Sequence, residues 1–109
     1  MSAKDFVNKT VVLKVTKPFG SKNPMGNFFY PINCGYIPVD SGRKKLQVYI
    51  LGIYEPIEVF EGTCIAVLHH LGDGKDKLIV VPSGKNYTDA QISALTEFQE
   101  KLFEHTIIR

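Results

Sequence analysis

Apolar and β-branched residues occur along this chain in short runs separated by Pro, Gly, Asn and Asp, a pattern typical of consecutive β-strands. Residues 10–16 are rich in Val and Thr and predict a first strand. Residues 46–51 predict a strand with two largely apolar faces, so we expect both faces to be covered. We expect further strands at residues 63–70 and 77–82, a short strand interrupted by Pro31 at residues 28–32, and a turn-rich connection at residues 38–45.

The pattern becomes helical near the C-terminus. Thr88 and Gln91 match a capping box, in which each side chain bonds the backbone amide of the other residue. Apolar residues then recur at helical spacing, at Ile92, Leu95, Phe98, Leu102 and Phe103. We expect Glu97, Glu100 and Glu104 to face water and His105 to lie at the helix C-terminus. About five strands and one helix predict a β-rich α+β fold: a small, closed, five-stranded, OB-like barrel with a C-terminal amphipathic helix packed on it.

Composition narrows the function classes. The chain has 109 residues, of which 44% are hydrophobic, and we expect one domain over residues 1–109. The net charge of +2 gives no support for nucleic-acid binding, and no apolar run is long enough to span a membrane. The first residues contain no apolar signal region, so we expect a cytoplasmic protein. Cys34 and Cys64 are expected to be buried, reduced thiols.

Several segments resemble the family I soluble inorganic pyrophosphatases. Phe29 to Pro38 is similar to the Tyr-Pro-x-Asn-x-Gly-Tyr-Ile segment of that family. Looser similarities follow in the same order, at Tyr49–Gly52, Gly62–Leu68, Asp76–Pro82 and Phe98–His105. The resemblance implies an inorganic-pyrophosphatase-like barrel domain and a homo-oligomer. It also implies Mg²⁺-dependent hydrolysis of pyrophosphate to phosphate.

The metal motif of that family is not retained. The family pattern Asp-x-Asp-x-x-Asp, counted back from the strand, falls on Gly42, Lys44 and Gln47. Mg²⁺ requires oxygen ligands, whereas residues 43–45 bring three cations that repel it. Only Asp40 and Asp73 stay as weak metal candidates. We therefore expect hydrolysis to be weak or lost, and the residues leave open whether the chain is an enzyme.

The phosphate-binding candidates are better retained. Lys77 stands at the position of the family's phosphate-binding lysine, and Tyr30 at a family tyrosine. Lys17 falls near the place of an early family arginine, and Lys44 belongs to the basic turn. Cations and hydroxyls of this kind can hold phosphate oxygens directly.

Three functions follow from these residues. The first is an inorganic pyrophosphatase family protein whose activity is weak or lost. The second is a metal-free module that binds pyrophosphate or another small phosphorylated ligand at the mouth of the barrel, with Tyr30, Lys44, Lys45 and Lys77 around it. The third, an OB-type binder of single-stranded nucleic acid, lacks an interleaved aromatic and basic pattern. We therefore expect neither a nucleic acid nor a membrane as a partner.

Overall fold

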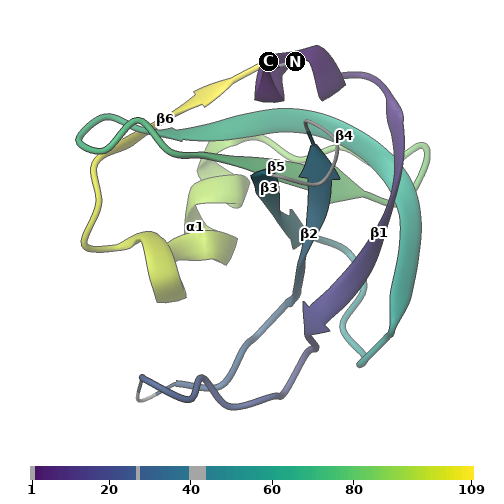
Figure 1. Cartoon of the computed structure of the whole chain (residues 1–109), viewed down its shortest axis with the longest axis vertical. Helices are drawn as coiled ribbons and strands as arrows, with labels where there is room; N and C mark the ends of the chain where they lie inside the picture. The colour runs from purple at the N-terminus through teal and green to yellow at the C-terminus, as the bar shows by residue number, and fades with distance from the viewer. Residues whose placement is uncertain (1, 27, 40–43) are drawn as a thin grey trace.

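The computed structural model describes residues 2–26, 28–39 and 44–109 (Figure 1). A short 3₁₀ helix, η1 (Ala3–Phe6), precedes the first strand. The remaining elements are β1 (Thr10–Lys17), β2 (Asn33–Val39), β3 (Lys44–Ile50), β4 (Val59–His70), β5 (Asp76–Val81), α1 (Asp89–Glu100) and β6 (His105–Ile108). Neither helix in these described ranges is long and apolar enough to cross a membrane.

Five of the strands close into a barrel. Their order is β1-β2-β3-β5-β4, and β1 pairs with β4 to complete the ring. The β3–β5 pair is parallel and the other pairs are antiparallel. Figure 1 shows α1 against the outside of this barrel. The predicted five-stranded barrel with one C-terminal helix is thereby confirmed.

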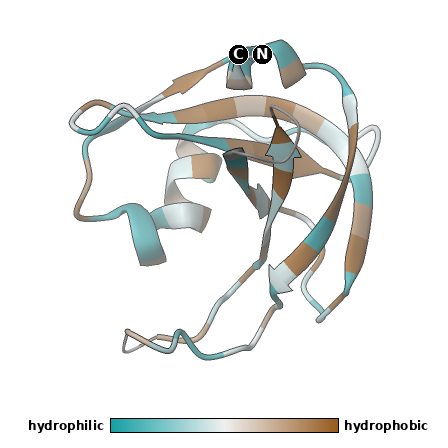
Figure 2. Ribbon diagram, viewed as in Figure 1, coloured by the Kyte–Doolittle hydropathy of each residue, from teal (hydrophilic) through white to brown (hydrophobic). Residues whose placement is uncertain are grey.

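The barrel wall separates two hydrophobic cores. Val48 and Ile50 of β3 belong to the core that fills the barrel, together with residues of β1, β4 and β5. Tyr49 and Leu51 face the other way and pack with Ile92 of α1 in a second core. Figure 2 shows apolar residues along the strands of the wall. The prediction that both faces of this strand are covered is therefore correct.

A bulge in β1 controls which residues face outward. The pairing of β1 with β2 shifts between Val15 and Lys17, so that Val15 lies opposite Gly35 and Lys17 opposite Cys34. Without the extra residue, Lys17 would point into the barrel. The two strands approach so closely that a Cβ on Gly35 would lie 2.2 Å from the carbonyl oxygen of Lys14. The glycine therefore permits the pairing that turns Lys17 outward.

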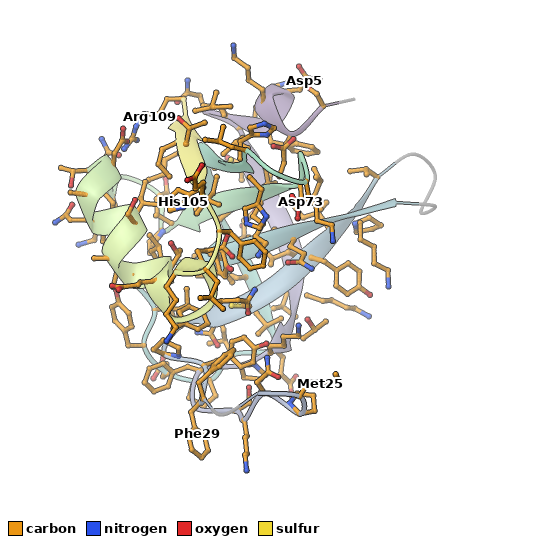
Figure 3. All side chains as sticks on the ribbon, turned by 90° about the vertical axis from the view of Figure 1, so that its left-hand side faces the viewer. Asp5, Met25, Phe29, Asp73, His105 and Arg109 are labelled. Atoms are coloured by element: carbon orange, nitrogen blue, oxygen red, sulfur yellow. The ribbon has the colours of Figure 1, made fainter. Side chains whose placement is uncertain are left out.

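Two local predictions about the region before β3 were wrong. No strand forms over residues 28–32, where the only pairing described is an isolated bridge between Lys22 and Phe29. The strand β2 runs instead to Val39, through part of the segment expected to be a turn. Strand pairing with both β1 and β3 outweighs the local preference of Pro38. Figure 3 shows Met25 and Phe29 on the preceding loop, pointing away from the body of the molecule.

The C-terminus differs from the expectation in a similar way. The capping box at Thr88 and Gln91 is confirmed, with bonds of 3.1 Å and 2.8 Å. The helix ends at Glu100, however, and Leu102 is 84% exposed. His105 begins β6 instead of ending the helix, because the β-branched residues that follow it pair with the free edge of β4.

Candidate functional site

A cavity of about 280 Å³ lies on the outer wall of the barrel. Residues of β1, β2 and β3 form its floor, Tyr30 comes from the loop before β2, and Gln99 comes from the last turn of α1. The strand register places Lys17, Cys34 and Tyr49 side by side across the floor. We call this cavity the cationic hollow. It lies on the outside of the barrel wall, whereas the sequence analysis expected a site at the barrel mouth.

Two lysines lie on opposite sides of the hollow. The Nζ atom of Lys17 is 5.7 Å from the centre of the Tyr30 ring, and that of Lys45 is 4.4 Å from the centre of the Tyr36 ring. Each ammonium group can form a favourable cation–π interaction with the negative face of its aromatic ring. None of the ion pairs found among the described residues involves either lysine. Both positive charges are therefore directed to the hollow and the solvent.

The other groups of the hollow are neutral. Gln47, which lies where the pyrophosphatase resemblance calls for a third aspartate, lines the hollow as an amide, as does Gln99. Burial raises the pKa of the Cys34 thiol to about 12, against smaller opposing effects of Lys17 and Lys77. Cys34 is thus a protonated thiol at neutral pH and a poor nucleophile. No carboxylate occurs among the described residues that line the hollow.

A buried polar network lies next to the hollow, centred on Glu100. This side chain is only 1% exposed, which contradicts the expectation that it faces water. It accepts hydrogen bonds from Lys77 Nζ at 2.6 Å and from the Tyr49 hydroxyl at 2.8 Å. On its other oxygen, His70 Nε2 lies at 2.5 Å. Both carboxylate oxygens of Glu100 therefore have buried hydrogen-bond partners.

The network sets the charge states of Glu100 and Tyr49. Burial alone would raise the pKa of Glu100, but hydrogen bonds from Lys77, His70 and Tyr49 lower it below its ordinary value. Burial and the Glu100 charge raise the pKa of Tyr49, so its hydroxyl stays protonated and cannot act as a base. His70 Nδ1 lies 3.2 Å from Asp73, so both ring nitrogens face carboxylates. His70 therefore links Glu100 to Asp73.

The residues predicted for the site lie in different surroundings. Lys17 and Tyr30 line the hollow, and the Tyr30 hydroxyl interacts with Asn23 Nδ2 at 3.0 Å. Lys77 lies behind the floor, is nearly buried, and donates to the Tyr49 hydroxyl at 3.1 Å. Asp73 is in the turn between β4 and β5. The Lys44 side chain and Asp40 lie outside the part of the chain that the structure describes.

The described residues do not fit the Mg²⁺ cluster that the resemblance implies. No group of three or more His, Cys, Asp or Glu side chains in residues 2–26, 28–39 and 45–109 is placed to hold a metal ion. The nearest carboxylate to the floor, Glu100, is already saturated by Lys77, His70 and Tyr49. Mg²⁺ binding would have to displace a buried ion pair, which is unfavourable.

Sequence reasoning missed Glu100 as a site residue, although a signal was present. Ile92, Thr96 and Glu100 recur every four residues and are the buried residues of α1. A helix face continued from Ile92 therefore reaches Glu100. The apolar stripe pointed instead to Leu102, which lies beyond the helix end. Tyr49 and Gln99 were also missed as lining residues, because their contact joins segments 50 positions apart.

Comparisons with known proteins give a likeness of fold without a sequence match. No protein-family model and no curated protein matches the chain. The inorganic pyrophosphatase of Ehrlichia chaffeensis is similar at a TM-score of 0.65 and 14% identity, over 91% of this chain and 84% of that one. The inorganic pyrophosphatase of Thermus thermophilus is similar at a TM-score of 0.59 and 16% identity, over 92% of this chain and 80% of that one. The inorganic pyrophosphatase of Helicobacter pylori is similar at a TM-score of 0.55 and 14% identity, over 99% of this chain and 85% of that one. The chain thus has the fold of these inorganic pyrophosphatases.

Proposed function

We propose that the cationic hollow binds a small phosphorylated anion, such as pyrophosphate, without a metal ion. We further propose that Mg²⁺-dependent hydrolysis of pyrophosphate by this chain is weak or lost. The observation that carries the proposal is the charge of the hollow. Lys17 and Lys45 bring two positive charges to it, and the described lining contains no carboxylate that could bind a metal ion.

Charge and hydrogen bonding both favour an anion in the hollow. Two ammonium groups on opposite sides can each form a charge-assisted hydrogen bond with phosphate oxygens, the stronger class of hydrogen bond in proteins. Gln47 and Thr16 add a neutral amide and a hydroxyl at the same wall. The volume of about 280 Å³ is sufficient for a small anion of this type. The site therefore supports binding by direct contacts.

The same residues give little support for hydrolysis. An attacking water needs a base or a metal ion that lowers its pKa. Cys34 and Tyr49 both have raised pKa values and hold their protons. The Glu100 carboxylate is ionised but is occupied by three donors. We assign Lys77 and Glu100 to positioning Tyr49 at the floor of the hollow, and not to direct contact with the ligand.

A calorimetric titration with pyrophosphate in the presence of a chelator tests the binding. We expect saturable binding by the unmodified protein and at least a tenfold loss in Lys17→Gln. Lys85→Gln, a change at an exposed loop lysine, is the matched control and should bind like the unmodified protein. Absence of binding at millimolar pyrophosphate would refute the proposed site.

A phosphate-release assay with pyrophosphate and Mg²⁺ tests the second part of the proposal. The fold likeness to inorganic pyrophosphatases makes this reaction the one to measure. We expect turnover far below the range of about 1–10³ s⁻¹ that is typical of enzymes. Turnover within that range would establish a hydrolase and overturn the loss of activity. A homo-oligomer and a cytoplasmic location stay predictions from the sequence.

A further inference from the structure

A second depression adjoins the cationic hollow on the outer wall of the barrel. It has a volume of about 440 Å³ and is lined by Val12, Leu13, Lys14, Tyr36, Pro38 and Val59. Most of these side chains are apolar, and we call the depression the apolar groove. It lies over β1, β2 and the beginning of β4, on the same outer surface as the hollow.

The hollow and the groove adjoin each other at Tyr36. Tyr36 lines both of them. Pro38 of the groove lies directly opposite Lys45 of the hollow in the β2–β3 register. Lys14 of the groove lies opposite Tyr36. We call the two adjoining depressions together the trough, which is cationic at the end near α1 and apolar at the other end.

The groove exposes large apolar side chains to solvent. Val12 is 60% exposed and Val59 is 59% exposed, in a register where Lys14 lies opposite Val59. A solvent-facing side of an antiparallel sheet normally carries polar residues at such positions. An exposed apolar patch that polar residues border is a mark of a binding surface. Here the bordering group is the cationic hollow itself.

We propose that the trough binds a free, single-chain organic phosphate, with its phosphate group in the cationic hollow and its apolar chain in the apolar groove. This inference rests on the proposed anion binding and specifies the class of ligand. Charge complementarity places the anion between Lys17 and Lys45. Because Tyr36 borders both depressions, a chain attached to the phosphate can extend past it over Val12 and Val59. Pyrophosphate would occupy only the hollow.

The inference predicts that affinity increases with chain length. Each fully buried methylene group strengthens binding by about fourfold. Hexyl phosphate has five more carbon atoms than methyl phosphate. If the groove buries about half of the added chain, hexyl phosphate should bind about 30-fold more tightly.

Calorimetric titrations of the full chain with methyl phosphate and hexyl phosphate, with chelator present, test this. Val59→Asp places a charge in the exposed part of the groove and should remove the preference for hexyl phosphate while methyl phosphate binds as before. Val59→Thr, which keeps the shape, should retain most of the preference. Lys17→Gln should weaken both ligands to the same degree. Circular dichroism checks that each variant is folded.

The outcomes separate this inference from the proposed function. Equal affinities for the two phosphates would overturn the apolar groove as a chain site and leave anion binding intact. No binding of either ligand while pyrophosphate still binds would overturn this inference alone, and loss of pyrophosphate binding as well would overturn both. Dimer formation that Val59→Asp abolishes in sedimentation experiments would overturn the inference, because the groove would then take a second copy. Binding to phosphatidic acid vesicles without binding to hexyl phosphate would also contradict it.

Discussion

At the scale of single residues, Glu100 governs the chemistry next to the site. Its carboxylate holds Lys77, Tyr49 and His70 together beneath the cationic hollow. Lys77, which the sequence resemblance predicted to bind phosphate, is half of a buried ion pair with Glu100. The presence of a lysine at position 77 therefore does not imply that this residue binds phosphate. The buried position of Lys77 becomes evident only once its partner, Glu100, is known.

Removal of the Glu100 charge should destabilise the fold strongly. Glu100→Gln leaves the Lys77 ammonium buried without its counter-charge, which typically costs about 3–5 kcal/mol. Glu97→Gln changes the same side chain at an exposed position of α1 and should alter stability by no more than about 0.5 kcal/mol. Urea denaturation of both variants measures the difference. Equal midpoints for the two variants would contradict the network.

Glu100 also predicts how stability depends on pH. Its pKa in the folded protein is below the ordinary value of 4.5, because hydrogen bonds to the charged form outweigh burial. Its contribution to the free energy of unfolding is therefore complete above pH 4.5 and decreases as pH falls through the lower, folded-state pKa. Thermal unfolding between pH 6 and pH 3 should show a steeper loss of stability in the unmodified protein than in Glu100→Gln. Parallel curves would show that other carboxylates cause the acid sensitivity.

At the scale of elements, local sequence determined some features and tertiary pairing determined others. The two faces of β3 and the cap of α1 follow from alternation and from a four-residue motif, so they could be predicted. Strand β6 could not, because its place depends on the edge of β4 that β1 leaves free beyond Thr63. The bulge in β1 was likewise not predictable, because only its pairing with Gly35 shows which way Lys17 points. The site depends on that bulge.

Substitution of Gly35 tests the role of the bulge. In Gly35→Ala, the new Cβ would lie 2.2 Å from the carbonyl oxygen of Lys14, so β1 and β2 must separate. We expect a loss of stability of about 1–3 kcal/mol, as for other overpacked sites, together with weaker pyrophosphate binding as Lys17 moves. Gly72→Ala is the control, because nothing lies within 4 Å of the place that its new Cβ would take. Unchanged stability and affinity in Gly35→Ala would refute the argument.

At the scale of the whole molecule, the barrel and its helix provide a fold shared with inorganic pyrophosphatases at 14% to 16% identity. A fold alone does not determine function, which depends on the groups in the site. Sequence reasoning named Lys17 and Tyr30 as phosphate-binding candidates; both line the hollow, and their binding of phosphate stays a prediction. It could not find the outer-wall location, since that requires knowing which strand faces α1. The described lining of the hollow carries lysines and neutral side chains and no carboxylate.

The dependence of pyrophosphate affinity on Mg²⁺ tests the central claim most directly. The dissociation constant should be measured by calorimetry with chelator and again with millimolar Mg²⁺. We predict binding with chelator that becomes no tighter when Mg²⁺ is added, because Lys17 and Lys45 contact the anion directly and Mg²⁺ would compete with them for it. Binding that appears only with Mg²⁺, or that becomes at least tenfold tighter with it, would contradict a metal-independent site.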